Sequence, residues 1–254
     1  MNVNLKFLLC GAAVWLFPQY AAAQCAVTDC QQLGYTSLKS CTGGLKCPFG
    51  EYWACPEVTK AELGSCNGYA KNCKIGDVLN RDGTCTTDKV SGKTPIGVVA
   101  YIGTDNCGQA FALENWFEVT WATEEIFIKS LAGEATKYDS CGNTKKIIET
   151  GDSTKYPAAW SVYNYAPVSA PETKGLWCLP EASIVNWFST IAYKANTVGG
   201  NVAVEIDGEK VYCWSSTQSS SASVHIFAPD GNGSGTTNKY DWRGDKCVWP
   251  VIEF

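Results

Sequence analysis

The sequence has very little histidine and few charged residues. It has one histidine, His225, and no Cys-x-x-Cys pair, so the usual zinc-ligand spacings are missing. Charged residues make up only 18% and the net charge is −5, which gives no basic footprint for nucleic acid. No segment after residue 23 reaches the about 20 apolar residues that cross a bilayer. We therefore expect no metal, no cofactor, no nucleic-acid partner and no membrane insertion.

The first residues have the order of a secretory signal peptide. Lys6 supplies a positive charge, Phe7–Phe17 forms a short apolar run, and Ala21–Ala23 offers small residues for cleavage. The alternative is a buried N-terminal strand or helix, which would not need this order. We expect residues 1–23 to be a signal peptide and the mature protein to be secreted or held at the cell surface.

Cysteine is abundant, and its density divides the chain. Of the fourteen cysteines, Cys10 lies in the signal peptide, so thirteen remain, an odd number. In an exported chain this content predicts a disulfide framework. Eight of them fall between Cys25 and Cys85, where aliphatic residues are few, so we expect residues 24–90 to form a small disulfide-stapled module. Within it, the Asp82-Gly83 turn signal predicts a hairpin that brings Cys73 close to Cys85.

The second part, residues 91–254, has enough apolar and aromatic residues for its own core. A helix is expected from Pro180, because Ile184, Trp187, Phe188 and Ile191 share one helical face. A shorter helix is expected over 145–150. The strands we expect are 94–102, one or two within 109–122, 202–206, 210–214, 223–228 and 247–254. This pattern predicts the α+β class with a mainly antiparallel sheet.

Several spaced blocks in the second part resemble a known family. Gly175–Pro180, Trp214–Thr217 and Val248–Phe254 resemble the Gly-x-Trp-x-Leu-Pro, Trp-Ser-Ser-Thr and terminal-strand blocks of the DUF1566 family of exported bacterial domains. Thr94–Ile102 and Tyr156–Ala159 resemble its upstream blocks more loosely. The family includes the C-terminal domain of a bacterial collagen-like adhesin. Its fold is similar to that of C-type lectins and formylglycine-generating enzymes.

The resemblance implies a C-type-lectin-like domain behind the cysteine-rich module. In such a fold a long irregular loop region, held on a small sheet, usually binds the ligand. The resemblance also implies a staple between Cys178 and Cys247, with Cys107–Cys141 as a second bridge. Cys213 would then remain unpaired. The step from fold to binding is an analogy.

Two segments are candidates for ligand binding. Trp214 could stack on a sugar ring, with the hydroxyls of residues 215–217 beside it; alternatively, Trp214 is a core residue and the hydroxyls close a turn. The Gly-rich loop 229–245 is the better candidate contact surface, since polar loops of this length are often functional. Its candidate residues are Asp230, Asn232, Asn238, Tyr240, Asp241, Trp242, Arg243 and Asp245. Complete lectin calcium motifs are missing here, so no metal is expected.

Three functions follow from these features. The first is an exported binding protein that recognises a glycan, a host matrix component or an envelope protein through loop 229–245; Arg243–Asp245, an Arg-Gly-Asp tripeptide, adds a possible integrin contact. The alternative is a structural or display protein with a tolerant loop and no fixed ligand. An enzyme is a third hypothesis, which we do not favour. It rests on Cys213 as a reactive thiol, with Lys210 and His225 as its evident activating partners.

Overall fold

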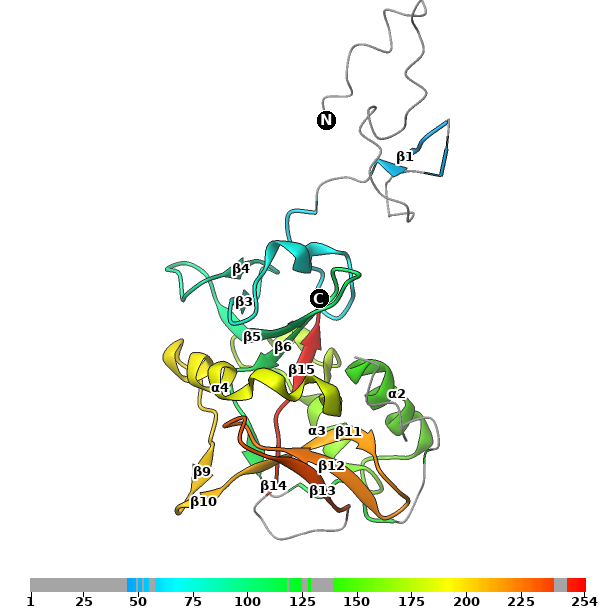
Figure 1. Cartoon of the computed structure of the whole chain (residues 1–254), viewed down its shortest axis with the longest axis vertical. Coiled ribbons are helices and arrows are strands. Elements are labelled where there is room, and N and C mark those ends of the chain that lie inside the picture. Colours follow the sequence, from blue (N-terminus) through cyan, green and yellow to red (C-terminus); the bar gives the residue numbers. More distant parts are fainter. Residues whose placement is uncertain are drawn as a thin grey trace, which may run out of the picture. The chain divides into compact units, whose positions relative to one another are not determined.

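The structure is a computed structural model that describes residues 45–48, 50–51, 53–54, 58–117, 119–124, 128, 139–239 and 246–254. The chain divides into two compact units, Met1–Glu57 and Val58–Phe254. In the first unit, β1 (Leu45–Lys46) and β2 (Trp53–Ala54) form an antiparallel pair. The expected signal peptide lies outside the described residues. The second unit combines sheets and helices, which confirms the α+β class (Figure 1).

A six-stranded antiparallel sheet forms one half of the second unit. Its order is β4-β3-β5-β6-β15-β8, with the bounds Cys85–Thr86, Val78–Asn80, Pro95–Ile102, Gly108–Ala112, Val251–Glu253 and Trp177–Cys178. One row of paired residues crosses five of these strands: Val78, Val98, Phe111, Val251 and Cys178. Every member of this row is buried. The pairing register is therefore fixed by a continuous apolar stripe.

A five-stranded sheet forms the other half. Its order is β13-β12-β11-β14-β7, with the bounds Ser234–Asn238, Ser223–Phe227, Tyr212–Gln218, Lys246–Val248 and Trp116–Phe117. Strands β11 and β14 run parallel, and the other pairs are antiparallel. Beside it, β9 (Glu205–Ile206) and β10 (Glu209–Lys210) form a hairpin. Asp207 and Gly208 both have positive φ and form its turn.

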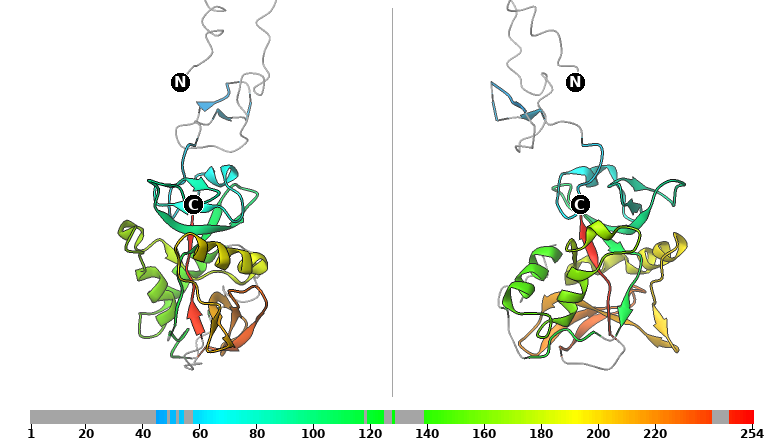
Figure 2. Two further views of the ribbon diagram at one scale, coloured as in Figure 1. Left: turned by 90° about the vertical axis from the view of Figure 1, so that its left-hand side faces the viewer. Right: turned by 180° about the vertical axis from the view of Figure 1, so that it is seen from behind.

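Helices α2 (Ser140–Thr150), α3 (Pro157–Asn164) and α4 (Phe188–Thr197) pack against these sheets. Short 3₁₀-helices are η2 (Tyr69–Asn72), η4 (Pro171–Thr173) and η5 (Ala182–Trp187). The helix expected from Pro180 therefore begins as η5 and becomes α-helical only at Phe188. Figures 1 and 2 show α2 and α4 on opposite sides of β15.

Two buried cores hold the second unit together. One joins Val99 of β5 to Ile191 and Ala195 of α4, and it extends to Phe227 and Trp249. The other joins α2 and α3 to the five-stranded sheet. Trp121, Tyr156 and Trp214 are the largest side chains of that second core. The five-stranded sheet contributes side chains to both cores, so its central strands are fixed from two faces.

The boundary between the units differs from the one expected at residues 90/91. Residues 58–90 belong to the same compact unit as the rest of the chain up to Phe254. Strand β3 pairs with β5 across that expected boundary, and the Cys66–Cys107 disulfide also crosses it. The Gly64 backbone N–H donates to the Glu253 carbonyl at 2.8 Å. The boundary lies instead at Glu57/Val58.

Four disulfides are present in the second unit, and they correct most of the expected pairing. Cys73–Cys85 is confirmed, across the β3–β4 hairpin. Cys107 bonds to Cys66 rather than to Cys141, and Cys141 of α2 bonds to Cys178 of β8. Cys213 and Cys247 are opposite each other on the parallel neighbours β11 and β14, and they bond to each other. The expected Cys107–Cys141 and Cys178–Cys247 bridges are therefore wrong, because strand pairing joins Cys247 to Cys213 and the packing of α2 on β8 joins Cys141 to Cys178.

Candidate functional site

The Trp-Ser-Ser-Thr block lies on β11 and is a structural element. Trp214 is fully buried, and its indole N–H donates to the Val119 carbonyl at 2.5 Å. The Ser216 backbone N–H donates to the Pro180 carbonyl at 2.8 Å, which ties β11 to the segment before η5. Trp214 has no ring face open to a ligand. The prediction that it could stack on a sugar is therefore wrong, and the alternative of a core residue holds.

A buried carboxylate completes this structural network. Glu181 is fully buried and accepts hydrogen bonds from the Thr217 hydroxyl at 3.2 Å and from the Ser183 backbone N–H at 3.0 Å. The Ser183 hydroxyl donates to the same carboxylate. The Glu181 backbone N–H donates to the Ser140 hydroxyl at 3.0 Å. These bonds join η5, β11 and α2, so Glu181 and the motif hydroxyls position the scaffold.

The expected contact loop 229–245 is described as far as Lys239, and it contains a strand. Pro229 is buried, and a short turn leads into β13, which pairs with β12 along all five of its residues. The Asp-Gly and Asn-Gly dipeptides of residues 230–233 are the hairpin signal that could have predicted this strand. The candidate residues Tyr240, Asp241, Trp242, Arg243 and Asp245 lie outside the described residues.

The turn before β13 is fixed by a charged contact. Asp230 accepts a hydrogen bond from the Asn232 backbone N–H at 2.9 Å and lies 3.4 Å from the Lys210 ammonium. Lys210 also donates to the Asn232 carbonyl at 3.0 Å. Partial burial raises the pKa of Asp230, but the hydrogen bonds from Asn232 and the Lys210 charge outweigh it and leave the pKa below its ordinary value. Asp230 thus anchors the hairpin, while the Asn232 side chain is exposed.

Strand β13 is the exposed rim of the five-stranded sheet. Among the described strands, only β12 pairs with it. Ser234, Gly235, Thr236 and Asn238 are exposed, and Thr237 is partly buried. On β12, Ile226 pairs with Gly235 and is partly buried, and His225 pairs with Thr236. The structure thus places Asn238 on an exposed edge and adds Ser234, Gly235 and Thr236, which were missed by the sequence analysis.

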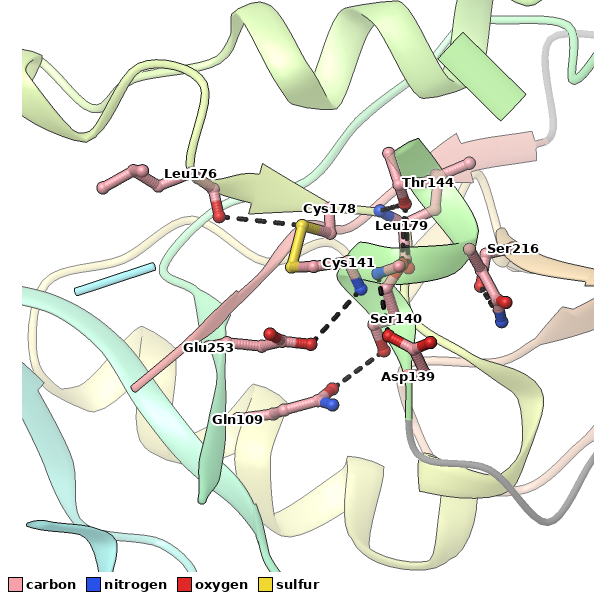
Figure 3. Close-up of a disulfide and its surroundings, with 12 residues drawn as sticks. Gln109, Asp139, Ser140, Cys141, Thr144, Leu176, Cys178, Leu179, Ser216 and Glu253 are labelled. Carbon is pink, nitrogen blue, oxygen red and sulfur yellow. Dashed lines mark hydrogen bonds between the residues drawn. A yellow bond between two sulfur atoms is a disulfide. The ribbon is translucent and has the colours of Figure 1, made fainter. Parts of the chain in front are cut away.

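A second solvent-facing feature is a cavity of about 420 Å³ beside the N-terminus of α2. It is lined by three carboxylates, Asp105, Asp139 and Glu253, together with the buried Gln109 and other residues. Figure 3 shows Glu253 and Gln109 extending toward the first turn of α2, next to the Cys141–Cys178 disulfide. The Gln109 side chain accepts a hydrogen bond from the Ser140 hydroxyl at 2.8 Å.

Each carboxylate of this acidic cavity already serves the local fold. Asp139 caps α2 by accepting from the Gly142 N–H at 2.9 Å, and Asp105 accepts from the Cys107 N–H at 3.1 Å. Glu253 accepts from the Cys141 N–H at 3.3 Å. Burial, with the nearby charge of Asp139, raises the pKa of Glu253 despite this bond. Across the described residues, no three His, Cys, Asp or Glu side chains are arranged to hold a metal ion.

The thiol on which the enzyme hypothesis rests is not free. Cys213 is fully buried and bonded to Cys247. Lys210, one of the two residues expected to activate this thiol, forms an ion pair with Asp230. His225, the other, is a half-buried residue of β12. Throughout the described segments of the chain, every cysteine is disulfide-bonded. The expectation that Cys213 remains unpaired is therefore wrong.

Comparisons with known proteins identify no family for this chain. No helix in the described parts of the molecule combines the length and the apolar character needed to cross a bilayer. No family model matches the sequence, and no curated protein matches it. A fimbrial protein from Bacteroides ovatus is similar in structure, with 12% identity and a TM-score of 0.44. The match covers 71% of this chain and 48% of that protein, so this chain spans about half of its length.

Proposed function

We propose that this chain is an exported binding protein whose contact surface is the β12–β13 hairpin with the residues that follow it up to Asp245. The observation that carries the proposal is β13, a polar and exposed strand at the rim of a sheet whose strands β11 and β14 are mostly buried. The ligand classes remain those expected from the sequence: a glycan, a host matrix component or a neighbouring envelope protein.

A rigid scaffold holds this hairpin. Strand β12 pairs with β11, and β11 is cross-linked to β14 by Cys213–Cys247. Binding residues commonly lie on exposed segments that a rigid scaffold positions. Four disulfides within the second unit are also typical of proteins that fold outside the reducing cytoplasm, which supports export. A C-type-lectin-like fold, membership of the DUF1566 family and an integrin contact at Arg243–Asp245 stay predictions from the sequence.

A display role is the alternative, and one observation favours it. A Cβ placed on Gly235 would meet no described atom within 4 Å beyond its chain neighbours, and Ser234 and Thr236 are exposed. Side chains at these positions can therefore change without disturbing a core. In a display protein, which has no fixed ligand, such changes would leave the function intact. In a binding protein they would weaken the binding of its ligand.

The test uses the full chain in its disulfide-bonded form against a glycan array and a panel of matrix and envelope proteins. A Ser234→Glu/Thr236→Glu variant places two charges on β13. The matched control is Val168→Glu, since Val168 is completely exposed and lies outside the hairpin. We expect wild type and Val168→Glu to retain a ligand that the double variant loses, with equal thermal stability of all three. Failure of the wild-type chain to retain any ligand would argue against a binding protein.

A further inference from the structure

The hydrogen-bond pattern of the hairpin determines which backbone groups of β13 face outward. The Lys239 N–H donates to the Ala222 carbonyl at 3.0 Å, and the Ala228 N–H donates to the Gly233 carbonyl at 2.8 Å. Both pairs fit the register of the strands between them. In an antiparallel ladder hydrogen-bonded and non-hydrogen-bonded pairs alternate. Gly235 and Thr237 therefore bond to β12, and the N–H and C=O groups of Ser234 and Thr236 point away from the sheet.

Among the described residues, this outer edge has none of the features that usually protect an edge strand. Natural edges are blocked by charged side chains, proline, bulges or a covering element. The residues Ser234–Asn238 include no charge and no proline, and their pairing with β12 runs without a register shift. Ser234, Gly235 and Thr236 are exposed. The edge is therefore ready to accept another strand.

The edge also has a specific position where a side chain is missing, Gly235 of β13. Gly235 pairs with Ile226 of β12, and no side chain at Gly235 covers Ile226, which is partly exposed. Because the N–H and C=O of Gly235 face β12, an added antiparallel strand meets Gly235 in a non-hydrogen-bonded pair, where side chains are closest. An apolar side chain opposite Gly235 would lie on the same face as Ile226 and cover it.

We propose that β13 binds an extended, uncharged segment of a partner protein as an added antiparallel strand, with an apolar side chain opposite Gly235. The inference rests on the proposed function and names its ligand class: a polypeptide read through its backbone. A second copy of this chain fits less well. Pairing of β13 with itself around Thr236 would place the hydroxyl-bearing Thr237 opposite Gly235, and each copy carries a net charge of −5.

The test uses a synthetic peptide of alternating threonine and valine, capped at both ends and flanked by lysine, and measures its binding to the full chain by fluorescence anisotropy. Thr236→Pro removes one outward N–H and keeps the inward bonds of Gly235 and Thr237. Thr236→Val is the matched control, because it changes the side chain and keeps the N–H. We expect wild type and Thr236→Val to bind equally, and Thr236→Pro to bind at least about tenfold more weakly.

Several results would overturn the inference: equal binding by Thr236→Pro, no peptide binding up to about 1 mM, or self-association of the wild-type chain through this edge. Should Thr236→Pro fail to fold, the wild-type chain is tested with a peptide N-methylated at alternate residues, which must not bind. A glycan or matrix ligand that Thr236→Pro retains and Ser234→Glu/Thr236→Glu loses would refute strand addition while leaving the binding function intact.

Discussion

Removal of the Cys66–Cys107 disulfide tests both the disulfide map and the extent of the second unit. This bond joins cysteines 41 residues apart, one before β3 and one just before β6. In the chain-entropy treatment a loop of that length stabilises the folded state by about 4 kcal/mol, whereas the Cys73–Cys85 bond, with a separation of 12, contributes about 3 kcal/mol. Loss of Cys66–Cys107 is therefore expected to cost more than loss of Cys73–Cys85.

Urea unfolding of the Cys66→Ser/Cys107→Ser variant, followed by tryptophan fluorescence, measures this cost. With a slope of about 2–3 kcal/mol per molar urea, a loss of about 4 kcal/mol lowers the midpoint by about 1.5 M. The transition of the second unit should remain single, because β3 still pairs with β5. The Cys73→Ser/Cys85→Ser variant is the control and should show a smaller shift.

Thiol titration of the denatured variant gives the result that would refute the disulfide map. If Cys66 and Cys107 bond to each other, replacing both creates no new thiol. If Cys107 bonds to Cys141, as the family resemblance implies, the double replacement leaves Cys141 with a reactive thiol. A new thiol in the Cys66→Ser/Cys107→Ser variant would therefore contradict the structure.

Three further predictions concern the scaffold. Trp214→Phe leaves the Val119 carbonyl unpaired and should cost about 1–3 kcal/mol of unfolding free energy without loss of ligand binding. Burial raises the pKa of Asp82, but hydrogen bonds, including the one from Lys93, hold this pKa at about 2. The ionised Asp82 therefore stabilises the fold above about pH 4, and this stabilisation is lost as the pH falls toward 2. Acid titration of Asp82→Asn should lack this loss. The pKa of Glu253 is raised, so this residue contributes its full stabilisation of the fold below pH 4.5, and the stabilisation is lost as the pH rises. Glu253→Gln should remove this pH dependence of the unfolding free energy.

The sequence correctly predicted those elements whose local residue pattern agrees with their burial in the structure. The apolar run 94–102 became β5, and the Asp82-Gly83 turn signal led to the confirmed Cys73–Cys85 bond. Helix α3 was missed, although Pro157 at its first turn is a start signal. The helix expected from Pro180 starts as a 3₁₀-helix, and the backbone N–H groups at its start bond to side chains of α2 and β11.

The remaining disulfides could not be derived from local pattern, and strand β13 was indicated only by the turn signal of residues 230–233 before it. Cys213 and Cys247 meet only because β11 and β14 are parallel neighbours, a tertiary fact. Strand β13 consists of Ser, Gly, Thr and Asn, of which Gly and Asn are depleted in strands, so pairing with β12 overrides its weak propensity. The Trp-Ser-Ser-Thr block suggested either a site or a core, and only its burial decided for the core.

The most direct test of the central claim, that β13 presents an open backbone edge, is amide hydrogen exchange measured by NMR on the free chain. We predict slow exchange at Gly235 and Thr237, whose N–H groups face β12, and fast exchange at Ser234 and Thr236. Addition of the threonine–valine peptide should slow exchange at Ser234 and Thr236 alone. Protection of all four amides in the free chain would show that the edge is already covered, and it would contradict the account.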